Sequence, residues 1–190
     1  MKLFYIRHVE SIANANGIVA GHSDVPISKL GTTQLKELYK ILGQEKVSAI
    51  YSSDLSRTRL TAEFIKKKCP DAPLVLTSQL RGRNYSGIEG KAVPTEQKES
   101  FYQSLYKIDF DYPGVESLKD FYERNFKFLL GLLQKHQNDN IIIVAHASNG
   151  RMISAIANGI GIERIGSDVR MPLPSEMRTF NLKNLAYSSN

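Results

Sequence analysis

Three short polar clusters each follow an apolar run that is typical of a buried strand. They are Arg7-His8-Val9-Glu10-Ser11, Ser52-Ser53-Asp54-Leu55-Ser56-Arg57 and His146-Ala147-Ser148-Asn149-Gly150-Arg151. Arginine side chains match the oxygen geometry of phosphate. A neutral histidine is a good nucleophile near pH 7 and can carry phosphate transiently. The residue types therefore indicate a site that binds a phosphoryl group and can accept it covalently.

The elements that must position these clusters can be read from the hydrophobic pattern. Apolar runs predict strands at 2–6, 47–51, 74–76, 140–145 and 178–182, the last at an edge and 140–145 in the centre. Helical periodicity predicts helices at 30–42, 56–67, 97–108, 116–136 and 149–158. A polar loop is expected after the first strand, and residues 81–100 are expected to be irregular.

Strands that alternate with helices predict an α/β fold around a largely parallel sheet. In such sheets, ligands bind in the crevice outside the carboxyl ends of the strands. The three clusters should therefore converge there, with helix N-termini after Ser53 and Ser148 adding backbone N–H donors.

The arginines should also control the ionisation of the nucleophile. A cationic His8 is disfavoured beside Arg7 and Arg57, so its neutral form should persist. Fixed cations stabilise the charge that spreads over the phosphoryl oxygens during transfer. The sequence has neither a dense Asp/His/Cys cluster nor a GxxxxGK[ST] loop, so we expect neither a metal nor a cofactor.

Composition bounds the remaining possibilities. The chain has 190 residues, which suits a single domain over 1–190, and one cysteine, Cys69, which excludes an internal disulfide. The net charge of +6 comes from scattered basic residues, which favours a small phosphorylated metabolite over nucleic acid as the partner. No apolar stretch approaches a membrane span or a secretory core, so a cytoplasmic protein is expected. The oligomeric state stays open.

The ordered motifs resemble a known family. Arg7-His8-x-Glu10-Ser11, followed by Asn14, resembles the signature opening of the histidine phosphatase superfamily, the phosphoglycerate mutase-like fold. The resemblance continues at 52–58, 61–63, 80–90 and 113–117, and at His146 with Arg151. It implies a three-layer sandwich, in which a mixed, mainly parallel central sheet is flanked by helices.

The resemblance also implies the roles of individual residues. His8 would take the phosphoryl group, and Arg7, Arg57 and His146 would bind its oxygens, with Asn14 in support. The chain is short beside the glycolytic mutases of this family, which favours a phosphatase over a mutase.

Substrate contacts are implied at further positions. Arg83 and Asn84 fall where the family often contacts the substrate. Gly21 and His22 match the loop that follows the catalytic strand, and Ala147 lies beside the second histidine.

The sequence departs from the family pattern at two positions near the chemistry. The glutamate that usually protonates the leaving oxygen is replaced by Gly82, and a glycine that usually follows the catalytic histidine is replaced by Val9. General acid help is typically worth about 10²–10⁴-fold. Either another carboxylate serves, with Glu10 favoured over Glu89, or the substrate needs little acid help, or activity is weak or absent.

These observations predict a metal-independent phosphomonoester hydrolase that acts through a phosphohistidine on His8. Two alternatives remain open at this point. One is a catalytically impaired protein that binds a phosphorylated ligand, and the other is a phosphoglycerate-type mutase.

Overall fold

The protein is built on one five-stranded sheet. The computed structural model describes residues 1–43, 45–93, 98–183 and 185. The strands are β1 (Lys2–Arg7), β2 (Ala49–Ser53), β3 (Leu74–Thr77), β4 (Asn140–Ala145) and β5 (Met177–Asn181), in the order β3-β2-β4-β1-β5. All neighbours are parallel except β5, which pairs antiparallel with β1. The sheet is therefore mixed and mainly parallel.

The register aligns the carboxyl ends of the three inner strands. Arg7 of β1 lies opposite Ala145 of β4, and Ser52 of β2 lies opposite Val144. The backbone N–H of His8 also donates to the carbonyl oxygen of Ala145 at 3.0 Å. The polar clusters that follow these strands consequently begin at the same edge of the sheet, as the sequence predicts.

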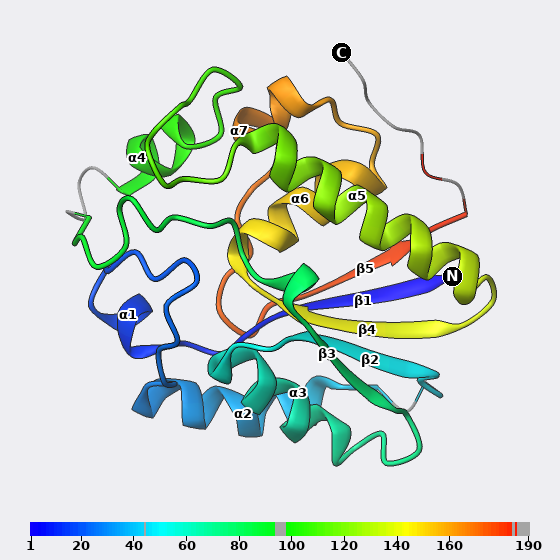
Figure 1. Cartoon of the computed structure of the whole chain (residues 1–190). Coiled ribbons are helices and arrows are strands. Elements are labelled where there is room, and N and C mark those ends of the chain that lie inside the picture. Colours follow the sequence, from blue (N-terminus) through cyan, green and yellow to red (C-terminus); the bar gives the residue numbers. More distant parts are fainter. Residues whose placement is uncertain (44, 94–97, 184, 186–190) are drawn as a thin grey trace.

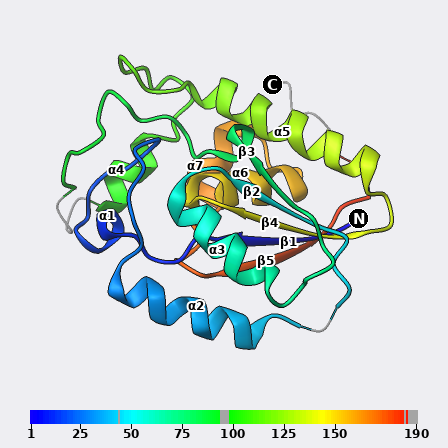
Figure 2. The ribbon, with the colours of Figure 1, turned by 60° about the horizontal axis from the view of Figure 1, so that its bottom comes forward.

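Helices cover both faces of the sheet (Figure 1). The larger ones are α2 (Lys29–Ile41), α3 (Ser56–Lys66), α5 (Leu118–Lys135) and α6 (Ala147–Ala157). In Figure 1, α2 and α3 lie below the sheet, and α5 and α6 lie above it. The view in Figure 2 keeps α2 and α5 on opposite sides. The fold is thus the three-layer α/β sandwich that was expected.

Alternating residues of the central strand divide the core into two halves. Ile141, Ile143 and Ala145 of β4 point into the cluster that contains α5 and α6. Ile142 and Val144 point into the cluster that contains α2 and α3. All five are buried, which fits a parallel strand covered on both faces.

Shorter elements lie beyond the ends of the strands. They are α1 (Ile12–Ala15), the 3₁₀ helix η1 (Ser78–Leu80), α4 (Lys98–Ser104), the 3₁₀ helix η3 (Ile162–Arg164) and α7 (Ile165–Asp168). Figure 1 shows α1 and α4 on the left, past the carboxyl ends of the parallel strands. They therefore frame the edge at which the polar clusters meet.

The element predictions hold except at a few boundaries. All five strands are confirmed, and β4 is central while β5 is an edge strand. The predicted loop after the first strand contains α1, because Ser11 and Asn14 cap its single turn with their side chains. The helix predicted at 97–108 ends at Ser104, and Gln97 lies outside the described residues. In the part of the chain that is described, no helix is long and apolar enough to cross a membrane.

Candidate active site

A cavity of about 850 Å³ opens at the edge where the three polar clusters meet. Nine of the eleven site residues predicted from the sequence line it: Arg7, His8, Glu10, Asn14, Gly21, Arg57, Arg83, His146 and Ala147. His22 and Asn84 are not among the lining residues. The cavity therefore gathers most of the side chains on which the predicted chemistry depends.

The ring of His8 is held in the tautomer that leaves one of its nitrogens unprotonated. It is 3% exposed, and its Nδ1 lies 2.6 Å from the carbonyl oxygen of Val9. A carbonyl oxygen only accepts, so Nδ1 carries the proton and Nε2 keeps its lone pair. Burial lowers the pKa of His8 well below 6.5, with smaller contributions from Arg7 and Arg57. The neutral ring can act as a nucleophile near pH 7.

Val9 does not crowd the cavity, although it replaces a small residue beside the nucleophile. Its side chain is fully buried and lies against α2, where a Cβ atom added at Gly31 would be 3.3 Å from Val9 Cγ2. The same added atom would be 2.2 Å from the carbonyl oxygen of Glu10. The absence of a side chain at Gly31 thus leaves room for Val9 and for the loop after β1.

Arg7 presents a partly unpaired guanidinium to the cavity. Its Nη1 donates to the carbonyl oxygen of Pro172 at 2.7 Å, and its Nε is buried without a hydrogen-bond partner among the described residues. Burial lowers the pKa of Arg7, but an arginine remains charged at neutral pH. Arg7 is therefore a fixed cation in the cavity wall, oriented by one backbone carbonyl.

Arg57 ties helix α3 to the loop at residues 21–23. Its Nη1 donates to the carbonyl oxygen of Ser23 at 2.7 Å, and its Nη2 donates to that of Gly21 at 2.9 Å. Burial lowers the pKa of Arg57 to about 10, and Asp24 and Glu89 oppose this effect. Arg57 is therefore a fixed cation, oriented by two backbone carbonyls.

His146 caps the helix that closes the site. It is the N-cap residue of α6, so the N-terminal turn of that helix faces the cavity through Ala147 and Ser148. Its Nε2 lies 3.0 Å from Ser53 Oγ, and its ring centroid is 5.2 Å from that of His8. Burial lowers the pKa of His146 well below 6.5, with Arg57 the next largest cause.

The loop at residues 21–23 is organised by Glu89 and Gly82. The carboxylate of Glu89 accepts from the backbone N–H of His22 at 2.5 Å and of Ser23 at 3.1 Å, and also from the Ser23 hydroxyl. His22 Nε2 donates to the carbonyl oxygen of Gly82 at 2.9 Å. His22 and Glu89 therefore support the loop that Arg57 grips, and Glu89 is not among the residues lining the cavity.

Gly82 lies directly against the second histidine. A Cβ atom added there would be 3.1 Å from Ser148 Oγ and 3.3 Å from Cβ and Cγ of His146. A side chain at this position would thus enter the cavity beside His146. Among the described residues, two carboxylates line the cavity. Glu10 accepts from Ser28 Oγ at 2.7 Å, and Asp168 is paired with Arg164.

The two residues predicted after Gly82 have different surroundings. Arg83 lines the cavity and is fully buried, with its Nε donating to the carbonyl oxygen of Glu116 at 2.6 Å and its Nη1 to that of Leu105. Asn84 instead pairs through its backbone with Glu116, whose carboxylate accepts its N–H at 3.0 Å. Glu116 also pairs with Arg124 at 2.9 Å. Asn84 therefore serves the loop rather than the cavity wall.

Asn14 stabilises the short helix α1. Its Oδ1 accepts from the backbone N–H of Ser11 at 3.2 Å and from Ser11 Oγ at 3.0 Å. This capping box fixes α1 at the mouth of the cavity. Asn14 thereby holds the turn that follows the His8 loop.

Several lining residues were not predicted as site residues. Arg151 belongs to the third polar cluster but was assigned no role of its own, and Tyr102 lies outside every predicted cluster. Residues 166–174 also line the cavity and have no recognisable motif. These segments reach the cavity by tertiary packing, which local patterns do not encode.

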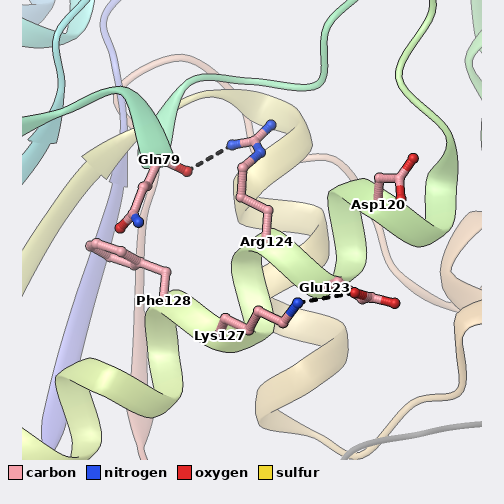
Figure 3. A pocket seen from close by; sticks show the side chains of 6 residues that line it. All are labelled: Gln79, Asp120, Glu123, Arg124, Lys127 and Phe128. Carbon is pink, nitrogen blue, oxygen red and sulfur yellow. Dashed lines mark hydrogen bonds and ion pairs between the residues drawn. The ribbon is translucent and has the colours of Figure 1, made fainter.

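A smaller hollow of about 440 Å³ lies outside this cavity, beside α5 (Figure 3). Its charged side chains already form ion pairs or hydrogen bonds with neighbouring residues. Lys127 Nζ is 3.2 Å from a Glu123 carboxylate oxygen, and Arg124 Nη1 donates to the carbonyl oxygen of Gln79 at 2.7 Å. We assign it no chemistry. Among the described residues, no group of three or more His, Cys, Asp or Glu side chains is placed to hold a metal ion.

Sequence comparisons identify relatives over most of the chain. A "Putative phosphoserine phosphatase 2" from Hydrogenobacter thermophilus is 30% identical over 168 residues, covering 86% of this chain and 82% of the relative. "Phosphoglycerate mutase-like protein 4" from Arabidopsis thaliana is 31% identical over 153 residues, covering 76% of this chain and 66% of the relative. The relatives therefore include proteins named as phosphatases and proteins named as mutases.

The fold has close counterparts among solved structures. YhfR from Bacillus stearothermophilus superposes with a TM-score of 0.85 at 19% identity, covering 97% of this chain and 94% of that one. A mycobacterial glucosyl-3-phosphoglycerate phosphatase superposes with a TM-score of 0.83 at 18% identity, covering 94% and 90%. The family model of the histidine phosphatase superfamily (branch 1) matches residues 3–172. With its two histidines and its arginines gathered in one cavity, the chain belongs to the histidine phosphatase superfamily.

Proposed function

We propose that this protein is a phosphomonoester hydrolase that acts through a phosphohistidine on His8. The observation that carries the proposal is the neutral, buried ring of His8, with Nδ1 held by the Val9 carbonyl oxygen and Nε2 unprotonated. Family membership supports a phosphoryl-transfer enzyme, and relatives named as phosphatases support hydrolysis.

In the first step, the Nε2 lone pair of His8 attacks phosphorus and the bond from phosphorus to the ester oxygen breaks. Arg7 and Arg57 are fixed cations that can stabilise the charge on the non-bridging oxygens. The N-terminal turn of α6 adds backbone N–H donors beside His146. In the second step, water attacks phosphorus, the bond to Nε2 breaks, and inorganic phosphate leaves.

The ester oxygen needs a proton as it leaves. Gly82 has no side chain to supply one, so we propose that Glu10 does so. Its carboxyl group lines the cavity two residues from His8 and accepts a hydrogen bond from Ser28 at 2.7 Å. Glu89, the other carboxylate considered, is occupied by three donors from the loop at 22–23.

A second function is favoured by the glycine at position 82. Without an acid at that position, the same cavity can bind a phosphorylated ligand and turn it over slowly or not at all. The mutase alternative has support only from the names of relatives, among them the "Probable phosphoglycerate mutase GpmB" of Escherichia fergusonii, which is 29% identical over 161 residues.

The test compares an aryl phosphate with an alkyl phosphate in the presence of EDTA, for the unmodified chain and His8→Ala. Para-nitrophenyl phosphate needs little acid help, whereas glycerol phosphate needs it. Cleavage of both by the unmodified chain, of neither by His8→Ala, and an acid-labile ³²P label on His8 are expected. Absence of any cleavage would favour the binding function. Exchange of phosphate between the two positions of phosphoglycerate would favour a mutase.

A further inference from the structure

A buried hydroxyl group that does not line the cavity bonds to the backbone of the second histidine. Tyr5 lies on β1, is fully buried, and belongs to the half of the core that contains α6. Its hydroxyl donates to the carbonyl oxygen of His146, and the backbone N–H of Gly150 donates to the same oxygen at 3.0 Å. Burial raises the pKa of Tyr5 well above 10, so the hydroxyl keeps the proton that it donates. The carbonyl group of the N-cap residue of α6 is therefore held from two directions.

This hydrogen bond also fixes the direction of a donor at the N-terminus of α6. The carbonyl oxygen of His146 and the N–H of Ala147 belong to one planar trans peptide unit, in which they point in opposite directions. Ala147 lines the cavity, and the first N–H groups of a helix have no acceptor within that helix. A hydrogen bond to the carbonyl oxygen polarises the peptide unit and strengthens its N–H as a donor. Holding the oxygen therefore orients the Ala147 N–H.

The Tyr5 hydroxyl can reach this oxygen because position 150 has no side chain. A Cβ atom added at Gly150 would be 2.5 Å from Cε1 and 2.6 Å from Cζ of Tyr5. It would also be 2.7 Å from Cγ of Pro172, whose carbonyl oxygen accepts from Arg7. A side chain at position 150 would therefore displace both the tyrosine and the proline.

We propose that Tyr5 is a positioning residue for phosphoryl transfer, and that its hydroxyl orients the peptide unit between His146 and Ala147. The proposal rests on the proposed function, since it assumes that the phosphoryl group lies between His8 and the N-terminus of α6. The effect is largest in the transition state, where a preorganised donor meets the charge that spreads over the phosphoryl oxygens. The hydroxyl, rather than the ring that packs in the core, is the part of Tyr5 that acts on the site.

The test measures the affinity for two anions by calorimetry, in the unmodified chain and in Tyr5→Phe. Orthovanadate forms five-coordinate adducts that resemble the transition state, whereas inorganic phosphate is the product. Since Tyr5→Phe keeps the ring and removes only the donor, we expect orthovanadate to bind about 10-fold more weakly and phosphate less than about threefold more weakly. Orthovanadate affinity within about threefold of that of the unmodified chain would overturn the proposal, and so would equal weakening of both anions.

Tyr51→Phe is the matched control. Tyr51 is a buried tyrosine on β2, and its hydroxyl pairs with Nε2 of His136 at 2.9 Å. His136 is the C-cap residue of α5 and lies shortly before β4 begins, so this bond is at the amino end of the parallel strands. Tyr51→Phe should leave both anion affinities unchanged. A loss of orthovanadate affinity as large as that in Tyr5→Phe would show a general effect of stability and overturn the proposal.

Gly150→Ala is a second variant, and a folding failure of Tyr5→Phe leaves it as the test. Its methyl group keeps the hydroxyl in the chain but displaces the Tyr5 ring from its place under α6. We expect orthovanadate to bind at least about 10-fold more weakly, because Pro172 is displaced as well. Unchanged orthovanadate affinity in folded Gly150→Ala would overturn the proposal.

The binding measurement separates this proposal from the proposed function. Selective loss of orthovanadate affinity in Tyr5→Phe, in a chain that hydrolyses no phosphate monoester, would support the positioning role and refute the hydrolase. In an active chain, kcat for para-nitrophenyl phosphate should fall by the same factor as the orthovanadate affinity, with little change in KM. Hydrolysis with a kcat that Tyr5→Phe leaves unchanged would support the hydrolase and refute the positioning role.

Discussion

The ring of His8 meets the ring of His146 edge-on, with their centroids 5.2 Å apart and their planes at 66°. Both rings are buried, and burial lowers both pKa values well below 6.5, with further lowering by nearby arginines. Two uncharged imidazoles therefore lie side by side in a cavity lined by cations. This arrangement suits a nucleophile, and it also makes the fold sensitive to acid.

Stability should fall as the pH drops below 6.5. In the unfolded chain both histidines take up protons below that pH, whereas the folded chain keeps them neutral, so the unfolded state binds more protons. The free energy of unfolding should decrease by up to about 1.4 kcal/mol per pH unit for each histidine. Urea denaturation between pH 7.5 and 5 measures this slope. His146→Gln should flatten it, and an unchanged slope in that variant would contradict the assignment.

Restoring a carboxyl group at position 82 should increase the hydrolysis of alkyl phosphates. The added Cβ atom would be 3.1 Å from the Ser148 hydroxyl, which can rotate away, so Gly82→Glu fits with a small shift of His146. If acid help is limiting, kcat for glycerol phosphate should rise by at least about 10-fold, and kcat for para-nitrophenyl phosphate should change little.

The control for this change is Gly82→Gln, which has the same shape and no proton to give. Gains that are equal in Gly82→Glu and Gly82→Gln would mean that the side chain acts by packing. No gain in Gly82→Glu would mean that the acid is already supplied elsewhere.

Arg57→Lys should impair catalysis although it keeps the positive charge. Lysine cannot donate to the carbonyl oxygens of Gly21 and Ser23 at once while facing a phosphoryl group. We expect kcat to fall by about 10²–10³-fold, the effect of losing one preorganised donor to the reacting group. Steady-state kinetics on para-nitrophenyl phosphate measures this. A kcat within threefold of the unmodified chain would remove Arg57 from the phosphoryl site.

Glu10→Gln and Glu89→Gln should have different signatures. If Glu10 supplies the proton, Glu10→Gln lowers kcat on alkyl phosphates by about 10²-fold and spares aryl phosphates. Glu89 instead holds the loop of His22 and Ser23, so Glu89→Gln should lower kcat on alkyl and aryl phosphates by the same factor. Parallel kinetics on the two substrates distinguishes these outcomes. A uniform loss in Glu10→Gln would show that this carboxylate is structural.

The sequence predicts the parts of the site that follow strands. Arg7, His8 and His146 are each placed by the end of a strand of the parallel core, and their convergence follows from the parallel pairing of β1 with β4. Arg57 is the second residue of α3, which begins two residues after β2 ends, so its position follows in the same way. Local pattern and sheet topology are sufficient for these four residues.

The remaining wall of the cavity could not be predicted in this way. His22 and Asn84 were expected to contact substrate, but they hold loops, because their partners Gly82 and Glu116 are distant in sequence. Arg151 belongs to a sequence motif but lies within helix α6 rather than at the end of a strand. Its surroundings depend on Tyr106, which comes from the segment after α4. Contacts of this kind depend on loop shape, which residue periodicity does not contain.

The antiparallel pairing of β5 with β1 has a consequence for how such a protein can be re-engineered. The chain must turn back after α6 to reach that strand, and residues 166–174 of the return segment form one wall of the cavity. The reacting groups follow the inner parallel strands, and their link to this segment runs through its backbone, since Arg7 donates to the carbonyl oxygen of Pro172. Exchange of the side chains of the return segment for those of a relative, with Pro172 kept, should therefore alter which esters are chosen and leave the phosphoryl transfer intact. By pairing with β1, the edge strand β5 fixes the end of a segment whose side chains can be exchanged to change substrate preference.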